Sequence, residues 1–435
     1  MIPRDCVVLL APFPRPWRWL GLSGGNCWIV VFHPWGGNVR GWEEFSMGIW
    51  SRLRLWYGRL EQVKDTVCLM RAKYIWGGKK MDKSKELLEE LTGAAGVSGF
   101  EGEVREIMRR YLAPLASIRQ DRLGCIIAEK AGAGEGPRVM LTAHMDEIGF
   151  MVKTVTEDGF LRFTPLGGWP EQVLLAQRVT IKGRRGDVPG VIGSKPPHLM
   201  DREERKKMVQ IKDMFIDVGA KDKEEVESLG IRPGDPIVPV GNMESMKNGK
   251  YLMAKAIDDR VGCGLLIEVC EELSGLGHPN TLYAVGTVQE EVGTRGAATS
   301  VAAIDPHVAL ILDVSIATDV PGLKGEVEGK LGQGPTIGLF DSSMIPNVNL
   351  RDLCIETAEE LAIPYQYSIM EGGGTDGGRI HLHGTGVPSL VIGVPVRYIH
   401  SHVGIMHLDD YLWARQLIVG LIRKLDTEAC KALIG

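Results

Sequence analysis

The chain has 435 residues, of which 44% are hydrophobic and 24% charged, a composition typical of globular proteins with more than one domain. Its formal net charge of -5 gives no basic field that would attract nucleic acid or an anionic membrane surface. No apolar run reaches the roughly 18 to 20 residues of a membrane span, and the 8 cysteines contain no CxxC pair. We therefore expect no nucleic acid or membrane partner, and buried thiols in a reducing compartment, the cytoplasm.

Residues 1–80 differ in composition from the rest of the chain. They contain eight of the ten tryptophans, and 12 Lys+Arg against 5 Asp+Glu. Gly77-Gly78-Lys79-Lys80 before Met81 is compatible with codons for a purine-rich ribosome-binding sequence. We predict that residues 1–80 are an extension that is disordered or results from a misassigned start, with translation beginning at Met81. The alternative is a genuine basic, Trp-rich interaction segment.

From Met81 onward the pattern predicts an α/β domain. Leu87, Leu88 and Leu91 indicate an amphipathic helix, and Ser98-Gly99-Phe100-Glu101 resembles a capping box for a second helix. Continuously apolar runs follow, which favour strands buried on both faces of a largely parallel sheet: 125–128, 139–143, 282–288, 308–312 and 390–394. Helical patterns after Asp258 and Asn349 and over 409–424 would cover the sheet.

Residues 152–249 have a different texture, with many Gly and Pro residues between short β-prone pieces such as 178–181. This pattern predicts a small β-barrel, with a short helix over 221–229. Because sheet-like segments flank it on both sides, we interpret it as an insertion. The catalytic domain would then consist of residues 81–151 and 250–435.

Histidine and acidic residues follow the predicted strands at the points where the strands end. Ligands bind outside the carboxyl ends of strands in open α/β sheets, so these side chains should meet at one edge. The residues concerned are His144, Asp146, Glu290, Glu291 and Asp313, together with Asp258 at the start of a helix and His400 after the last strand.

Imidazole and carboxylate ligands without thiolates suit Zn²⁺, Co²⁺ or Mn²⁺. The two histidines, Asp258, Asp313 and one of the two glutamates would make five ligands. Five ligands are too many for one catalytic zinc ion, but they are enough for two ions if one carboxylate bridges them. Two cations roughly 3.5 to 4 Å apart can hold a hydroxide between them and polarise a carbonyl group. A neighbouring carboxylate must then transfer the proton of the water, and the Glu290-Glu291 pair offers one ligand and one base.

Each feature taken singly has a simpler interpretation. One histidine after a strand is more often a packed residue than a ligand, and Asp258-Asp259 can simply cap a helix. Asp313 is harder to dismiss, because a carboxylate that closes an apolar strand needs a cation or hydrogen-bond donors. The recurrence of these residues at consistent strand ends favours a metal centre.

Six motifs in order resemble the glutamyl aminopeptidase family that includes the tetrahedral (TET) aminopeptidases, some of which have been labelled endoglucanase. The resemblance covers about residues 81–428, and its motifs are A-H-M-D-E-I-G-F at 143–150, A-I-D-D-R-x-G at 256–262, Q-E-E-V-G-x-R-G at 289–296, D-V at 313–314, G-G-G-T-D at 372–376 and R-Y-I-H-S at 397–401. It implies a doubly wound catalytic domain with an inserted PDZ-like β-barrel used for dimerisation, and dimers that assemble into a dodecamer.

The resemblance also implies roles for the site residues. His144 and Asp313 would hold one metal, Glu291 and His400 the other, and Asp258 would bridge them. Glu290 would be the general base, and Asp146 would orient His144. His402 lies close to His400, and the R-Y-I-H-S match favours His400.

The leading hypothesis is a dinuclear metallo-aminopeptidase that removes N-terminal residues from short peptides. A metal-dependent deacylase or deblocking enzyme acting on N-acyl amino acids or peptides is the alternative. A glycosidase would leave His144 and His400 without a role, and an intact ligand set argues against a scaffold. The preferred side chain stays open: Arg379 can attract an acidic residue or form a surface ion pair.

Overall fold

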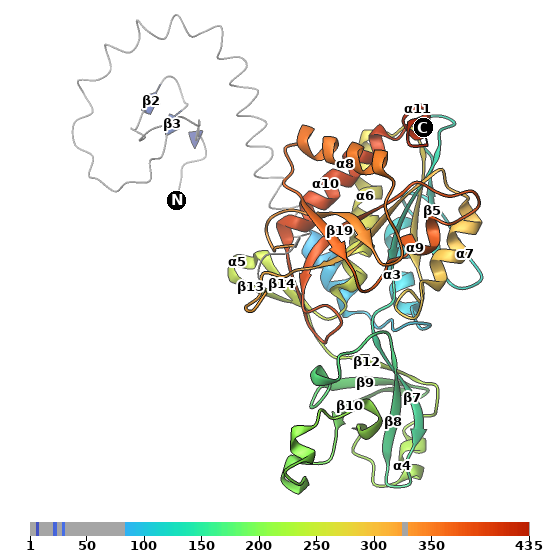
Figure 1. Cartoon of the computed structure of the whole chain (residues 1–435), viewed down its shortest axis with the longest axis vertical. Helices are drawn as coiled ribbons and strands as arrows, with labels where there is room; N and C mark the ends of the chain where they lie inside the picture. Colours follow the sequence, from blue (N-terminus) through green and yellow to red (C-terminus); the bar gives the residue numbers. More distant parts are fainter. Residues whose placement is uncertain (1–5, 8–20, 24–27, 31–82, 324–328, 435) are drawn as a thin grey trace, which may run out of the picture. The chain divides into compact units, whose positions relative to one another are not determined.

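The computed structural model describes residues 6–7, 21–23, 28–30, 83–323 and 329–434 (Figure 1). It divides into two compact units, Met1–Ser84 and Lys85–Gly435. In the first unit, residues 6–7, 21–23 and 28–30 form a three-stranded sheet in the order β1 (Cys6–Val7), β3 (Trp28–Val30) and β2 (Gly21–Ser23). The predicted start at Met81 concerns residues that lie almost entirely outside the described ones, and it stays a prediction.

The second unit contains an 11-stranded sheet whose four central strands are parallel. In spatial order they are β15 (Thr281–Thr287), β6 (Arg138–His144), β16 (Val308–Ile316) and β19 (Ser389–Arg397). Each coincides with an apolar run, because a central strand is covered on both faces and so carries apolar side chains throughout. The α/β fold predicted from the sequence is confirmed.

The flanks of this sheet are mainly antiparallel, so the sheet is mixed and only its centre is parallel. On one side of the parallel strands lie β5 (Ile126–Lys130) and β4 (Ser117–Gln120), and on the other side β20 (Gly404–His407), β14 (Tyr251–Ala254) and β13 (Glu244–Met246). A branch leaves β19 through β17 (Thr336–Asp341), which pairs antiparallel with β19 and parallel with β18 (Gln366–Met370).

Helices cover both faces of the sheet (Figure 1). On one face α6 (Ile257–Leu276) packs on β6 and β16, and α10 (Leu408–Lys424) packs on α6 and β19. On the other face, Met140 and Ile311 share a core with Val301 of α7 (Arg295–Ile304) and Ile380 of α9 (Gly377–Ile380). A central parallel sheet with helices on both faces is the doubly wound arrangement. The remaining main helices are α3 (Gly102–Leu112) and α8 (Val348–Glu360).

Gly264 shows why α6 can lie close to its neighbours. A Cβ atom at this position would lie 2.9 Å from the Tyr411 hydroxyl oxygen of α10 and 3.1 Å from Leu88 Cδ2, in the helical segment over residues 83–93. Contacts that short are repulsive. The glycine therefore allows three helices to meet on this face.

The inserted barrel is closed by six strands in the order β10-β11-β8-β7-β12-β9. Phe150, Ile181 and Ile216 are among the buried residues of its core. The barrel strands begin at Gly149 and end at Pro239, and the segments before and after them belong to the large sheet. The strands are β7 (Gly149–Val155), β8 (Phe160–Leu166), β9 (Arg178–Gly183), β10 (Gly186–Gly193), β11 (Phe215–Asp217) and β12 (Pro236–Pro239), with α4 (Lys223–Ser228) beside them.

The capping box expected at Ser98 to Glu101 is wrong. Helix α3 begins at Gly102, and Glu101 at its N-cap makes no side-chain capping bond. The Ser98 hydroxyl instead donates to the Asp146 carboxylate at 2.6 Å. Glu101 Oε1 accepts from the N–H groups of Gly99 and Gln289. These polar residues support the loops around Asp146 and Gln289 rather than a helix end.

No helix among the described residues is long and apolar enough to span a membrane. The cysteines in residues 83–434 are free and buried, as expected for structural thiols: Cys125, Cys263, Cys270, Cys354 and Cys430.

Candidate metal centre

The residues predicted from strand ends come together at one edge of the sheet. Strand β6 ends at His144, Asp313 lies within β16, and α6 begins at Ile257 just before Asp258. Glu290 and Glu291 follow β15, and His400 follows β19. Adjacent parallel strands carry their carboxyl ends to the same edge, which explains why residues so distant in sequence meet there.

Two groups of potential ligands share Asp258. His144, Asp258 and Asp313 form one group, and Asp258, Glu291 and His400 form the other. Within each group one ligand atom from every residue lies within 4.8 Å of the others. Because Asp258 belongs to both groups, its carboxylate lies between two possible ion positions.

The orientation of His144 leaves one ring nitrogen free to bind an ion. Its Nδ1 lies 3.0 Å from the main-chain oxygen of Asp146, and a carbonyl oxygen can only accept, so Nδ1 carries the hydrogen. Nε2, which lies 3.1 Å from Asp258 Oδ1, is then the ring nitrogen that can bind an ion. The Asp146 carboxylate is 3.7 Å from Nδ1. The main-chain oxygen of Asp146 is thus the atom that fixes the tautomer, rather than its carboxylate.

The Asp146 carboxylate organises the loop that carries Glu290 and Glu291. It is fully buried, and its two oxygens accept from the Glu290 N–H at 2.9 Å and the Glu291 N–H at 3.2 Å. Burial favours a raised pKa for Asp146, but the nearby His144 ring and the hydrogen bonds from the Ser98 hydroxyl and the Glu290 N–H hold its pKa below the usual value. Asp146 is therefore an ionised anchor between two strand ends.

The two aspartates at the start of α6 have different roles. Asp259 Oδ1 accepts from the Gly262 N–H at 2.9 Å, as a capping aspartate does, and its Oδ2 accepts from the His144 N–H at 3.2 Å. The peptide bond between Asp258 and Asp259 is cis. The capping interpretation of this pair thus applies to Asp259, whereas Asp258 faces the site.

Burial and mutual repulsion raise the pKa values of the site carboxylates. Burial and the nearby charge of Asp258 raise the pKa of Asp313 to about 8. Burial is also the main cause of the raised pKa of Glu291 and Glu290, with further contributions from neighbouring carboxylates. Carboxylates crowded in this way need compensating positive charge.

Several observations show that the residues present fit divalent cations. Glu291 Oε1 is buried and has no hydrogen-bond partner among the described residues. His400 Nε2 lies 3.4 Å from the other oxygen, Glu291 Oε2, and 3.7 Å from Asp258 Oδ2. Histidine and carboxylate ligands without thiolates are the set that suits Zn²⁺, Co²⁺ or Mn²⁺.

Left-handed backbone conformations surround the centre. Ala256, Gln289 and His400 have φ angles of 51°, 56° and 57°, although none of them is a glycine. Such conformations cost free energy and cluster at functional sites. Each lies within two residues of a predicted ligand or base, so the loops that position the site carry part of the backbone strain of the protein.

The other histidines near the centre belong to neither ligand group. The His402 ring is buried, packs 5.0 Å from the Trp169 ring of the inserted domain, and both of its nitrogens lack partners among the described residues. Burial lowers the pKa of His402 to about 4. His381 bonds to the Gly377 main-chain oxygen, and His383 lies 3.3 Å from Asp305. The structure thus separates His402 from the possible ligands.

The centre opens into a cleft of about 810 Å³. His144, Asp258, Glu290, Glu291, Asp313 and His400 all line it, together with the Gly372–Thr375 segment and Arg379. Arg379 Nε donates to the Thr294 hydroxyl at 3.2 Å. The cleft is large enough for the end of a peptide.

Some residues that support the centre were not identified from the sequence. Asp376 is buried, and its Oδ2 accepts from the Thr287 hydroxyl at 2.6 Å. Burial raises the pKa of Asp376 to about 6. Its place at the end of the Gly-rich motif could have indicated this role. Ser98 had no such signal, because its contact with Asp146 spans distant parts of the chain.

Known proteins are similar to this chain over most of its length. The sequence pattern of the M42 glutamyl aminopeptidase family matches residues 124–417, and a pattern described as AMPT matches residues 82–108. The glutamyl aminopeptidase of Lactococcus lactis subsp. cremoris MG1363 is 38% identical over 345 residues, which cover 78% of this chain and 96% of that protein.

Two solved structures are similar to this chain in fold as well as in sequence. The TET aminopeptidase of Thaumarchaeota archaeon SCGC AB-539-E09 has a TM-score of 0.79 and 47% identity, covering 81% of this chain and 99% of that one. The Pyrococcus horikoshii TET1 peptidase, which can assemble into a tetrahedron or a large octahedral shell, has a TM-score of 0.72 and 34% identity, covering 79% and 100%. The chain therefore belongs to the M42 glutamyl aminopeptidase family of metal-dependent peptide-bond hydrolases.

Proposed function

We propose that the chain is an aminopeptidase with two divalent cations, which removes N-terminal residues from short peptides. The observation that carries this proposal is the pair of ligand groups that share Asp258. A single catalytic ion needs about three protein ligands. Five ligand residues, one of which is the shared Asp258, are better matched to two ions.

The proposed ligand roles follow from these groups. His144 Nε2 and Asp313 would hold one cation, Glu291 and His400 the other, and Asp258 would bridge both. When bound, two cations supply Lewis-acid activation of the peptide carbonyl and lower the pKa of water. Zn²⁺ or Co²⁺ fits the ligand set, and Mn²⁺ is also compatible.

Glu290 is the proposed general base. It lines the cleft beside the ligands, and burial raises its pKa above that of an ordinary glutamate, which makes it a stronger base. Its carboxylate would accept a proton from the attacking water and deliver it to the leaving amine. Asp146 would support this step by holding the Glu290 N–H, which keeps the loop in place.

The negative charge of the cleft also suits a substrate with a free amino terminus. The α-ammonium group of a peptide would lie near the carboxylates, whereas an N-acylated peptide offers no positive charge. This difference favours an aminopeptidase over the deacylase and deblocking alternatives.

The assembly state is part of the same proposal. Solved structures of the TET1 peptidase show a dodecamer, and the P. horikoshii protein can assemble into a tetrahedron or a large octahedral shell. By similarity to them, we propose that this chain is a homo-oligomer in which dimers, formed through the inserted barrel, assemble into a dodecamer. Its cytoplasmic location stays a prediction.

Metal removal and restoration tests the proposal. Dialysis against a chelator should abolish hydrolysis of aminoacyl-p-nitroanilides, and Zn²⁺, Co²⁺ or Mn²⁺ should restore it with two ions per subunit by elemental analysis. N-acetylated versions of the same substrates should stay intact throughout. Full activity in protein shown to contain no metal, or preferential cleavage of the acetylated substrates, would contradict the proposal.

A further inference from the structure

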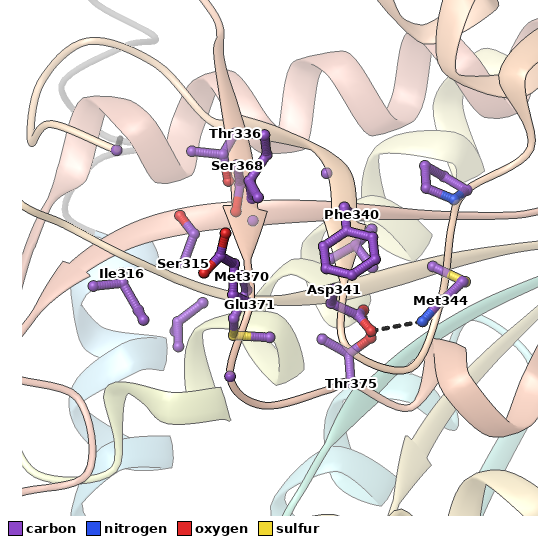
Figure 2. Close-up of a pocket in the computed structure, with 18 of the residues that line it drawn as sticks. Ser315, Ile316, Thr336, Phe340, Asp341, Met344, Ser368, Met370, Glu371 and Thr375 are labelled. Atoms are coloured by element: carbon purple, nitrogen blue, oxygen red, sulfur yellow. Dashed lines mark hydrogen bonds between the residues drawn. The ribbon is translucent and has the colours of Figure 1, made fainter. Parts of the chain in front are cut away.

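A second pocket of about 540 Å³ adjoins the metal-lined cleft (Figure 2). It is lined by residues of β16, β17, β18 and β19 and of the segment after β18. The two cavities share part of their walls, so a substrate held in the cleft can extend one group into the pocket. The shared residues are Val314, Ile316, Met370, Gly372 and Thr375.

Much of the pocket wall is apolar. Ile316, Phe340 and Met370 contribute to it, together with Met344 and Val391. A long hydrocarbon stem can lie against such side chains and be removed from water, which stabilises binding by about 0.8 kcal/mol for each buried CH₂. The pocket therefore suits a long side chain rather than a short one.

Three hydroxyl groups of the wall lack hydrogen-bond partners. The side-chain oxygens of Ser315, Thr318 and Thr336 are buried and have no partner among the described residues, and all three residues line the pocket. Thr336 is 1% exposed and Ser315 is 8% exposed. Buried hydroxyls are normally hydrogen-bonded, so these oxygens indicate a polar group that binds in the pocket.

The charged residues among those that line the pocket are both acidic, Asp341 and Glu371. Both carboxylate oxygens of Asp341 are hydrogen-bonded within the fold. Its Oδ1 accepts from the Met344 N–H at 2.8 Å (Figure 2) and from the Ser343 hydroxyl at 2.6 Å. Its Oδ2 accepts from the Thr375 hydroxyl. No described residue forms a hydrogen bond or ion pair with the exposed Glu371 carboxylate. In Figure 2, Glu371 lies on the same side of the pocket as Ser315, Thr336 and Ser368.

We infer that this pocket receives the side chain of the N-terminal residue, and that Glu371 makes the enzyme prefer lysine or arginine there. The inference rests on the proposed aminopeptidase function. The stem of either residue would contact the apolar wall, and its cationic end would donate to Glu371 and to the unpartnered hydroxyls. An ammonium group offers three donors and a guanidinium group five.

Glutamate and aspartate side chains fit this pocket poorly. Their carboxylates would lie near Glu371 and Asp341 with no cationic side chain among the described lining residues, and like charges repel. The family is described as glutamyl aminopeptidases, but this pocket would not select an N-terminal glutamate.

Aminoacyl-p-nitroanilides and a series of X-Ala-Ala peptides provide the test, with X as Lys, Arg, Leu, Met or Glu. The wild-type enzyme should give its highest kcat/KM with Lys or Arg and its lowest with Glu. Glu371→Gln should lower kcat/KM for Lys and Arg about tenfold relative to Leu and Met, a difference of about 1.4 kcal/mol. Glu371→Lys should improve Glu substrates relative to Lys substrates.

Glu135→Gln is the matched control, because Glu135 is exposed, lies outside the pocket and gives the same change in net charge. It should leave the ratio of Lys to Leu activity unchanged. Equal loss for Lys and Leu in Glu371→Gln would overturn the inference, because it would place Glu371 at the α-amine common to all substrates. A wild-type preference for Leu or Glu would also overturn it while leaving the aminopeptidase function intact. Absence of hydrolysis for every X would instead refute the proposed function.

Discussion

Asp146 connects two parts of the centre through different atoms of one residue. Its main-chain oxygen sets the His144 tautomer, and its carboxylate holds the N–H groups of Glu290 and Glu291. The adjacent glutamates then differ in environment, because Glu291 belongs to a ligand group and Glu290 does not. Single substitutions can separate these functions.

Glu290→Gln and Glu291→Gln form a matched pair, since the chemical change is the same one residue apart. Glu290→Gln should lower kcat by about 10² to 10⁴, the usual contribution of general acid–base catalysis, while elemental analysis still finds both metals. Glu291→Gln should lose one metal as well as activity. Full activity of Glu290→Gln would refute its role as the base, and unchanged metal content in Glu291→Gln would refute its role as a ligand.

A second pair separates His400 from His402. His400→Ala should lower the metal content, because His400 lies in a ligand group. His402→Phe should keep both metals and most of the activity, because the His402 ring packs on Trp169 with no hydrogen-bond partner among the described residues. Elemental analysis with the aminoacyl assay checks both variants. Metal loss in His402→Phe alone would reverse the assignment.

At the scale of secondary-structure elements, the site depends on how strands and helices end. Four parallel strands deliver ligands or their loops to one edge, and the turn into α6 directs Asp258 toward the site while Asp259 caps the helix. Elsewhere α10 supports the turn before β17, where the Asp410 carboxylate accepts from the Gly332 and Gly334 N–H groups, both at 2.7 Å.

The raised pKa of Asp410 should make the stability of the protein depend on pH. Burial raises its pKa to about 7, although the two N–H groups act to lower it. Between about pH 4, near the unfolded pKa, and about pH 7, the folded state holds a proton that the unfolded state has lost. Protonated Asp410 therefore makes its full contribution to the free energy of unfolding below about pH 4, and this contribution is lost as the pH rises to about 7.

Urea unfolding of the wild type and Asp410→Asn across this range checks the prediction. The free energy of unfolding of the wild type should fall relative to the variant by up to about 1.4 kcal/mol per pH unit. The comparison cancels the other titrating groups, and any constant cost of the substitution leaves the slope unchanged. Parallel curves for the two proteins would show that Asp410 titrates normally.

At the scale of the whole molecule, the unit Lys85–Gly435 contains every component of the site. It also contains the core of the barrel and the cores on both faces of the large sheet. We therefore predict that its fold and its activity require no residue before Met81.

A chain that begins at Met81 tests this conclusion. It should show the same metal content, melting temperature and kcat/KM as the full chain. N-terminal sequencing of the natural protein tests the predicted start at the same time. A mature terminus near Met1 would refute that start, and a large loss of stability on truncation would show that residues 1–80 contribute to the fold.

Sequence patterns alone predict the main strands and helices of the second unit and the candidate site residues. Apolar runs such as 139–143 and 308–312 predicted central strands, because residues covered on both faces must be apolar along the whole strand. Polar residues directly after these runs, among them His144 and Asp313, were then recognisable as candidates. The barrel was visible from its Gly and Pro content, although its first strand begins at Gly149, slightly before the predicted insertion.

How these residues combine depends on tertiary contacts between distant parts of the chain. Chain spacing carries no information on distances between strand ends, so the division of five ligands into two groups that share Asp258 appears only after folding. The same holds for the contact between Ser98 and Asp146 and for the burial of His402. The pocket beside Glu371 likewise forms only in the folded chain, because its walls come from strands that lie far apart in the sequence.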